Sequence, residues 1–225
     1  MKKILFLYPV LLFFFISASC QNTSQTNKEE EKNKQQSVTP VQTEEENGLR
    51  KAYFASGCFW CVEVIFESVH GVKESISGYS GGHTQNPTYE SSNTGRTGHA
   101  EANEIIYDPE IVSFTTLVDV YFNSQNITQV NGQGPDNGSQ YRSILFYQNV
   151  EEKEIIDKKI SAINADLGGD KVAAQVLPFE KFWIAEEYHQ NYEKNNPTNS
   201  YIVNVSIPRL NRFKAKMPEV LKKNN

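Results

Sequence analysis

The stretch GCFWCVE at residues 57–63 decides how the folded part of this chain is organised. A short apolar run at residues 51–55 precedes it and predicts a strand. Apolar residues then recur through residue 69 at the spacing of one helix face. Cys58 therefore lies at the start of a predicted helix. Backbone N–H groups and the positive end of the helix dipole favour a thiolate there, and the thiolate is the reactive form of cysteine.

The N-terminus has the layout of a secretory signal peptide at residues 1–20. Two lysines precede an unbroken apolar run from residue 4 to residue 16, and small residues follow before Cys20. The run is too short to span a bilayer comfortably. The chain is either cleaved as an ordinary exported protein or lipidated on Cys20, and lipidation is preferred because a lone cysteine there has no structural task. We therefore expect an exported protein, periplasmic or otherwise extracytoplasmic, that contacts a membrane only through a lipid anchor.

Polar and charged side chains dominate residues 21–48, which contain almost no large apolar residue. Such a segment cannot bury enough surface to fold, so it is predicted to be a disordered linker. The folded domain is expected at residues 49–210. A basic tail at residues 211–225 is expected to be solvated or to form a short surface helix. The formal net charge of -5 argues against nucleic acid as a partner.

Three cysteines are too few for a framework of structural disulfides, even in an exported protein. Cys58 and Cys61 form a C-x-x-C pair that is redox-active, metal-binding or idle. A zinc site would need two further ligands, and the four histidines show no paired spacing that completes one. No metal is therefore expected.

Strands and helices alternate along the rest of the folded part. Residue patterns predict strands at 72–79, 100–107, 141–147, 172–177 and 201–207, and helices from Ser113, at 150–167 and at 185–194. This order favours an α/β or α+β sheet with helices packed against it.

Two long polar loops, at residues 80–98 and 124–139, interrupt this pattern. Loops of such length inside a compact domain are usually functional or disordered. In and beside them stand the stretches GYSGG (78–82), NPTY (86–89), GRTGHAE (95–101) and GPDNGSQYRS (134–143).

These stretches and the GCFWC motif occur in the order and spacing of one family. From about residue 51 through residue 192 the chain resembles the peptide methionine sulfoxide reductase A family. The expected fold is accordingly α/β: an α+β two-layer sandwich with a ferredoxin-like sheet, packed helices and long irregular loops. The resemblance implies an enzyme, a peptide-methionine (S)-S-oxide reductase, that uses no cofactor and is expected to be a monomer.

The resemblance assigns the first block of site residues. Cys58 matches the nucleophile that attacks the sulfoxide sulfur and retains the oxygen as a sulfenic acid, which is covalent catalysis. Phe59 and Trp60 match the aromatics that line the pocket around the substrate methyl group. Without the resemblance, Cys58 would be interpreted as a small buried hydrophobic residue, and Phe59 and Trp60 as core residues at a helix start.

The polar loops supply the remaining site residues by the same resemblance. Glu101 matches the carboxyl group that donates a proton to the sulfoxide oxygen, which requires burial to keep it protonated. Tyr89 and Tyr141 match phenols that hydrogen-bond that oxygen. Asp136 matches an acid that orders the pocket. Outside the resemblance, Glu101 would be a surface charge and Asp136 a turn residue.

The chain departs from many relatives in how the sulfenic acid is cleared. Family members often carry resolving cysteines near the C-terminus, whereas no cysteine follows Cys61 here, and glycine is common in the family at its position. Residues three apart at a helix start bring their Cα atoms to roughly 5 to 6 Å, which a disulfide tolerates. We expect Cys61 to attack the Cys58 sulfenic acid, giving a disulfide that a thioredoxin-like reductant opens. Alternatively, Cys61 is a bystander and an external thiol resolves Cys58.

Two further positions bear on the site. Residues 125–128 read QNIT where the family usually has His-Asp-Pro-Thr, so the loop there is expected to be shaped differently. His189 is expected to be a structural hydrogen-bonder. The function expected overall is repair of oxidised methionine, in proteins and free, outside the cytoplasm. The alternative of a different class is a non-catalytic anchored thiol electron carrier or a metal-binding module that uses the C-x-x-C pair.

Overall fold

The computed structural model describes residues 38–223, so the predicted signal peptide, its Cys20 and most of the predicted linker lie outside the described residues. The strands are β1 (Arg50–Ala55), β2 (Val72–Ser80), β3 (Ala100–Tyr107), β4 (Gly132–Gln133), β5 (Asp136–Asn137), β6 (Ile144–Tyr147), β7 (Gln175–Pro178) and β8 (Phe182–Ile184). The helices are α2 (Phe59–Glu67), α3 (Tyr89–Asn93), α4 (Phe114–Asn123), α5 (Val150–Leu167), α6 (Tyr192–Asn195) and α7 (Ile207–Lys216).

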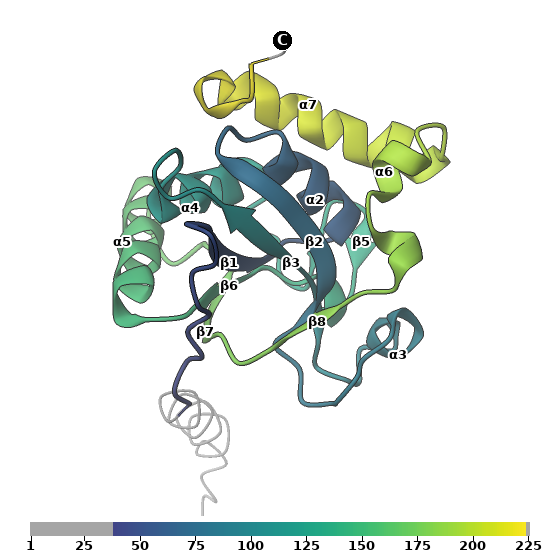
Figure 1. Cartoon of the computed structure of the whole chain (residues 1–225), viewed down its shortest axis with the longest axis horizontal. Coiled ribbons are helices and arrows are strands. Elements are labelled where there is room, and N and C mark those ends of the chain that lie inside the picture. The colour runs from purple at the N-terminus through teal and green to yellow at the C-terminus, as the bar shows by residue number, and fades with distance from the viewer. Residues whose placement is uncertain (1–37, 224–225) are drawn as a thin grey trace, which may run out of the picture. The chain divides into compact units, whose positions relative to one another are not determined.

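Six strands form one sheet in the order β7-β6-β1-β3-β2-β8 (Figure 1). Its centre, β6-β1-β3-β2, is antiparallel throughout, and α2 links β1 to β2 while α4 links β3 to β6. This order is the predicted ferredoxin-like arrangement. β7 extends it as a parallel neighbour of β6, and β8 extends it as an antiparallel neighbour of β2.

The main hydrophobic core lies between one face of this sheet and its helices. Phe54 of β1 stacks on Phe66 of α2 with ring centroids 5.3 Å apart, and Tyr121 of α4 and Phe213 of α7 belong to the same buried cluster. Full burial of one such aromatic side chain contributes about 1.5–3 kcal/mol to the stability of the folded state. Helix α2, which begins at the C-x-x-C motif, is therefore anchored by its apolar face.

The C-terminal region differs from the prediction. Residues 201–207, expected to be an edge strand, are helical: Ile202–Ser206 forms a π-helical turn that continues into α7. Pro208 lies where this π-helical turn passes into α7, and a proline inside a running helix removes one regular i→i−4 hydrogen bond. The β-branched residues suggested a strand, but the buried positions Ile202 and Phe213 follow helical spacing.

The expected boundary at residue 210 falls inside α7, so the basic end expected at residues 211–225 begins as a helix, and Phe213 of this helix is buried. After α7, the His70 N–H donates to the Val220 carbonyl at 2.8 Å and the Lys222 N–H to the Ser68 carbonyl at 2.9 Å. The helix predicted at residues 185–194 is also wrong. A short 3-10 turn and α6 replace it, separated by Asn191 in the left-handed region with φ 53°.

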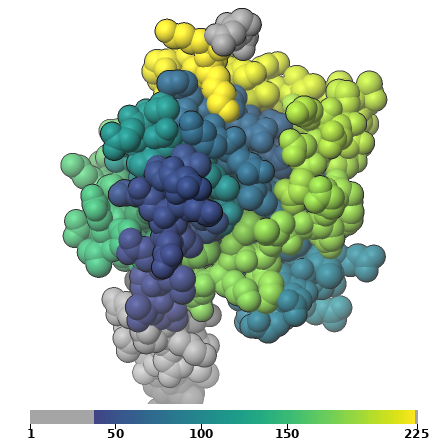
Figure 2. Space-filling model, viewed as in Figure 1, coloured from purple at the N-terminus to yellow at the C-terminus, as the bar shows by residue number. Residues whose placement is uncertain are grey.

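The segment 38–48, predicted as the end of the linker, packs on the domain. The Val41 N–H donates to the Phe179 carbonyl at 2.7 Å, and the N–H and hydroxyl of Thr43 both donate to Gln148 Oε1. Figure 2 shows these first described residues, in dark purple, on the surface of the domain. Between residues 38 and 223, no helix is both long enough and apolar enough to cross a membrane.

Candidate active site

A cavity of about 230 Å³ opens at the start of α2 and collects residues from five separate parts of the chain. Its lining is Cys58, Phe59, Trp60, Tyr89, Glu101, Asp136, Tyr141, Asn199 and Tyr201. The structure thus brings together every residue predicted for catalysis and substrate binding except Cys61. The sequence analysis missed Asn199 and Tyr201, and it expected Tyr201 to begin an edge strand.

Cys58 occupies the N-cap position of α2, as the sequence predicted. The backbone before it depends on Gly57, which has φ +76°, a conformation that other residues rarely adopt. A Cβ atom on Gly57 would also lie 2.5 Å from Cβ of Gln133. The glycine therefore lets the chain turn sharply from β1 and present the thiol to the cavity.

Glu101, on β3, completes the helix start. Its Oε2 accepts a hydrogen bond from the Phe59 N–H at 3.0 Å, so it satisfies a first-turn donor that the Cys58 side chain does not. Burial of the carboxyl group, with smaller contributions from Asp136 and Cys61, raises the pKa of Glu101 to about 8. The group is therefore protonated near neutral pH and can act as a general acid.

The two thiols belong to one buried cluster and have opposite pKa shifts. Burial is the largest cause that raises the pKa of Cys58 well above its usual value, and the neighbouring Cys61 thiol adds to it. The neighbouring Cys58 thiol and the charge of Arg209 lower the pKa of Cys61. Desolvation therefore opposes the effect of the helix start, which favours a thiolate on Cys58.

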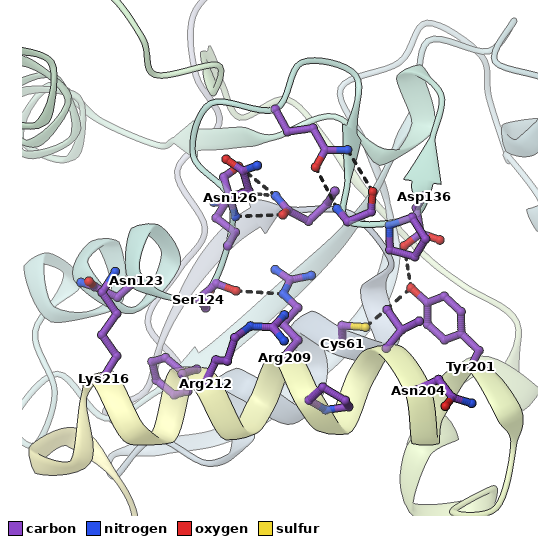
Figure 3. A pocket seen from close by; sticks show the side chains of 18 residues that line it. Cys61, Asn123, Ser124, Asn126, Asp136, Tyr201, Asn204, Arg209, Arg212 and Lys216 are labelled. Carbon is purple, nitrogen blue, oxygen red and sulfur yellow. Dashed lines mark hydrogen bonds between the residues drawn. The ribbon is translucent and has the colours of Figure 1, made fainter. Parts of the chain in front are cut away.

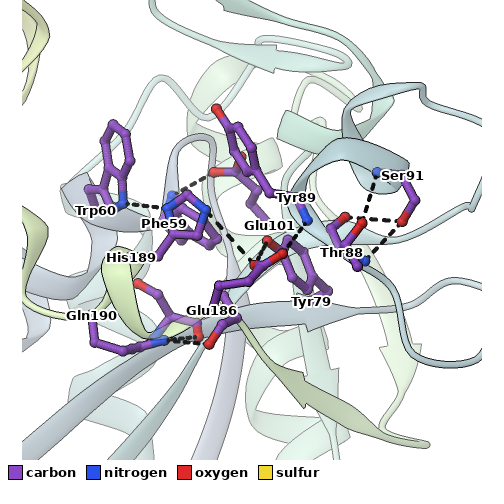
Figure 4. A network of polar contacts seen from close by, with 12 residues as sticks. Phe59, Trp60, Tyr79, Thr88, Tyr89, Ser91, Glu101, Glu186, His189 and Gln190 are labelled. Atoms are coloured by element: carbon purple, nitrogen blue, oxygen red, sulfur yellow. Dashed lines mark hydrogen bonds and ion pairs between the residues drawn. The ribbon is translucent and has the colours of Figure 1, made fainter.

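An aromatic cluster forms the apolar wall of the cavity (Figure 4). Trp60 stacks on Tyr192 with centroids 3.7 Å apart, and its indole N–H donates to His189 Nδ1 at 3.2 Å. His189 also contacts Phe59 and Tyr89, with centroids 4.9 and 4.6 Å away. Burial lowers the pKa of His189, so it is a neutral acceptor that fixes Trp60. This is the predicted hydrogen-bonding role of His189.

The phenols are fixed by residues that the sequence did not single out. Glu186 accepts from the Tyr89 N–H and from the Tyr79 hydroxyl, each at 2.9 Å (Figure 4). Tyr89 is the first residue of α3, a short helix inside the loop predicted at residues 80–98. The Tyr141 hydroxyl reaches Asn93 Oδ1 of the same helix at 3.4 Å.

Cys61 faces a second cavity, on the other side of the Asp136–Tyr201 pair (Figure 3). The Tyr201 hydroxyl donates to Asp136 Oδ2 at 2.5 Å and lies 3.7 Å from Cys61 Sγ. Both Asp136 and Tyr201 also line the first cavity. The pair therefore forms a thin partition between the two thiol environments.

The unusual loop at residues 125–128 borders this second cavity. Gln133 binds both of its first residues: its Oε1 accepts from the Asn126 N–H at 2.8 Å, and its Nε2 donates to Gln125 Oε1 at 3.1 Å. The loop was expected to be shaped differently from that of the family, and here hydrogen bonds between the side-chain amides of Gln125 and Gln133 and the backbone of Asn126 hold it. Within residues 38–223, no group of three or more His, Cys, Asp or Glu side chains is placed to hold a metal ion.

The site defines a class of protein. A cysteine beside a protonated carboxylic acid, with phenols and an aromatic wall, suits a thiol-dependent oxidoreductase whose substrate joins a polar oxygen to an apolar group. The comparison with known proteins narrows this class. The family model described as "Peptide methionine sulfoxide reductase" matches residues 50–221, and the chain belongs to this family.

Individual relatives agree with this assignment. The chain is 43% identical over 173 residues to the peptide methionine sulfoxide reductase MsrA of Pasteurella multocida, covering 77% of this chain and 99% of that one. It is 45% identical over 165 residues to the MsrA of Nautilia profundicola, covering 73% and 94%.

Solved structures show the same fold. Methionine sulfoxide reductase A of Corynebacterium diphtheriae is 33% identical with a TM-score of 0.60, covering 68% of this chain and 77% of that one. Reduced Mxr1 from Saccharomyces cerevisiae is 28% identical with a TM-score of 0.65, covering 70% and 91%. The protein is therefore an oxidoreductase of the methionine sulfoxide reductase A type.

Proposed function

We propose that the protein reduces the S epimer of methionine sulfoxide, in proteins and as the free amino acid, through a sulfenic acid on Cys58. The observation that carries this proposal is the pairing of two groups in one cavity: the Cys58 thiol and the buried Glu101 carboxyl group. One supplies the nucleophile and the other the proton that the departing oxygen needs. Phe59 and Trp60 form the apolar surface that receives the methyl group.

The first half-reaction balances with the groups present. Cys58 attacks the sulfoxide sulfur, and its thiol proton passes to the Glu101 carboxylate that remains once Glu101 has protonated the sulfoxide oxygen. Glu101 gives a proton to the sulfoxide oxygen, and the phenols of Tyr89 and Tyr141 stabilise the charge that grows there. The oxygen then moves from the substrate sulfur to Cys58 Sγ: the substrate S–O bond and the transient S–S bond break, a Cys58 S–O bond forms, methionine leaves, and Cys58 becomes a sulfenic acid. Methionine sulfoxide is reduced by two electrons, and Cys58 is oxidised by two.

The second half-reaction uses Cys61. Its sulfur attacks the sulfenic sulfur of Cys58, a disulfide forms, and the oxygen leaves as water. The Cys61 N–H already donates to the Cys58 carbonyl at 3.1 Å, and both thiols are free and buried, which protects the intermediate from other reactants. A thioredoxin-like dithiol then opens the disulfide.

The proposed location follows from the sequence of residues 1–20. The signal-peptide pattern and Cys20 support an exported protein that is tethered by a lipid and repairs oxidised methionine outside the cytoplasm as a monomer. Membrane fractionation of cells that express the full chain tests this. Cys20→Ala releases the protein from the membrane fraction if Cys20 is lipidated, and unchanged fractionation contradicts the anchor.

Turnover on separated epimers tests the proposed reaction. The purified full chain with dithiothreitol is expected to reduce the S epimer and leave the R epimer, and Cys58→Ser abolishes turnover. Failure to reduce either epimer would instead support a non-catalytic thiol carrier or metal-binding module.

A further inference from the structure

The second cavity, of about 650 Å³, is larger than the one that holds the catalytic residues. Helix α7 forms one wall and the loop from Asn123 to Asp136 forms the other, and Cys61 lies between Tyr201 and Arg209 (Figure 3). We call this space the Cys61 cleft. Its volume lies in the range of small-molecule sites, roughly 300–1,000 Å³.

The walls of the Cys61 cleft are cationic. Arg209, Arg212 and Lys216 line it from successive turns of α7, and Figure 3 shows them along one side of the space. None of these three cations forms an ion pair with a described carboxylate. Arg209 donates instead to neutral oxygens of Ser56 and Ser124.

Asp136 is the one carboxylate in the described lining, and it already accepts the Tyr201 hydroxyl. Positive charge therefore exceeds negative charge around the cleft. A ligand that carries carboxylates would gain electrostatic attraction here, and a cationic ligand would be repelled.

We propose that the Cys61 cleft binds a low-molecular-weight thiol that carries carboxylates and directs its sulfur onto Cys61 of the oxidised enzyme. This inference rests on the proposed Cys58–Cys61 disulfide, and it adds a second route for reductant beside the thioredoxin-like one. Substrate and small thiol then reach opposite ends of the same disulfide.

Geometry decides which sulfur is attacked. A thiolate displaces a disulfide sulfur along the S–S axis, from the side opposite the leaving sulfur. Cys58 lines the substrate cavity and Cys61 lines the cleft, so a thiolate in the cleft meets Cys61 and expels Cys58.

The depth of Cys61 favours a small reductant. Cys61 is only 1% exposed and lines the cleft, so a small molecule inside the cleft approaches Cys61, whereas a thioredoxin-like protein acts from the side of Cys58, which lines the other cavity. The entering sulfur displaces the Tyr201 hydroxyl from Cys61, and that hydroxyl keeps its hydrogen bond to Asp136.

The exchange consumes two thiols. The first thiolate forms a mixed disulfide with Cys61 as the Cys58–Cys61 bond breaks, and Cys58 leaves as a thiolate that takes up a proton. A second thiolate attacks the small-molecule sulfur of the mixed disulfide and releases Cys61. Two thiols are oxidised to one disulfide, and the enzyme disulfide is reduced by two electrons.

Charge-matched thiols test the cleft. The full-length enzyme is oxidised with methionine S-sulfoxide without reductant, and loss of two thiols is confirmed before the test begins. Rate constants for opening the disulfide are then measured with anionic glutathione, neutral 2-mercaptoethanol and cationic cysteamine, each corrected for its thiolate fraction. Absence of the disulfide at the first stage overturns the proposed recycling, and only its presence allows the charge test.

Charge reversal in the cleft gives the expected pattern. In the double variant R212E/K216E, the ratio of the glutathione rate to the 2-mercaptoethanol rate falls about tenfold, equivalent to 1.4 kcal/mol, and the cysteamine ratio rises. R212K/K216R keeps the wild-type ratios. K158E/K171E, a matched double charge reversal at exposed positions outside the cleft lining, also keeps them. Equal ratios in wild type and R212E/K216E overturn the proposal.

The site of attack gives an independent readout. Brief reaction with glutathione, acid quenching and fragment-ion mapping of the peptide that contains residues 57–63 is expected to place the glutathione on Cys61, with Cys58 as the free thiol. Glutathione on Cys58 overturns the inference but leaves the proposed reduction of methionine sulfoxide intact.

Discussion

Replacing Glu101 by Gln removes one proton from the active site and preserves its shape. The Gln side-chain carbonyl still accepts the Phe59 N–H that Glu101 Oε2 accepts at 3.0 Å, so the start of α2 keeps its cap. With a pKa of about 8, Glu101 is about nine-tenths protonated at pH 7, and Gln cannot supply that proton. General acid catalysis contributes about 10²- to 10⁴-fold, so kcat/KM for the S epimer is expected to fall by about 10²-fold or more.

The pH dependence separates this role from a structural one. The protonated form of Glu101 is active, so the wild-type rate falls as pH rises through about 8, and Glu101→Gln lacks that limb. The pKa of Glu101 is raised from 4.5 to about 8 on folding, so the free energy of unfolding falls as pH rises between these two values, and the Gln variant lacks this loss. Single-turnover methionine formation between pH 6 and 9 measures the first effect. A Gln variant within threefold of wild type at pH 7, or one that keeps the high-pH limb, refutes the general-acid assignment.

Three further changes test recycling, backbone geometry and the C-terminal helix. Cys61→Ser is expected to lose one thiol per turnover without reductant, where wild type loses two; equal thiol losses in thiol titration exclude the internal disulfide. Gly57→Ala places a residue with a Cβ atom at φ +76°, where that Cβ would clash with Gln133. The free energy of unfolding should therefore fall by more than about 1 kcal/mol, and an unchanged midpoint of thermal unfolding would contradict this strain. Phe213→Ala should lower the free energy of unfolding, measured with urea, by about 3–5 kcal/mol because Phe213 is buried. A decrease of less than about 1 kcal/mol would mean that α7 is only a surface helix.

Local patterns in the sequence predicted the elements that carry the nucleophile and the acid. Residues 100–107 form β3 over the expected range, and Cys58 begins α2 as the helix pattern requires. These predictions held because the apolar residues after Cys58 follow the spacing of one helix face, and because β3 is a central strand that is buried along almost its whole length. The roles of Tyr89 and Tyr141 came from family resemblance, because no local pattern brings α3 and the 3-10 turn at Ser139–Tyr141 to one cavity.

The missed features depend on contacts between distant segments. Tyr201 reaches Asp136 and Cys61 only because the π-helical turn Ile202–Ser206 continues into α7, and its β-branched residues alone predict a strand. The effect of desolvation on the pKa of Cys58 was also missed, since the burial of Cys58 depends on tertiary packing. Glu186 escaped notice because its partners, Tyr79 and Tyr89, lie about a hundred residues away.

The central claim is that Cys58 takes the oxygen of methionine S-sulfoxide. Trapping the product of one turnover in the Cys61→Ser variant with a sulfenic-acid reagent such as dimedone tests it most directly. The account predicts one methionine per enzyme from the S epimer and one dimedone adduct, located on Cys58. Methionine formation without an adduct on Cys58, or no methionine at all, would contradict it.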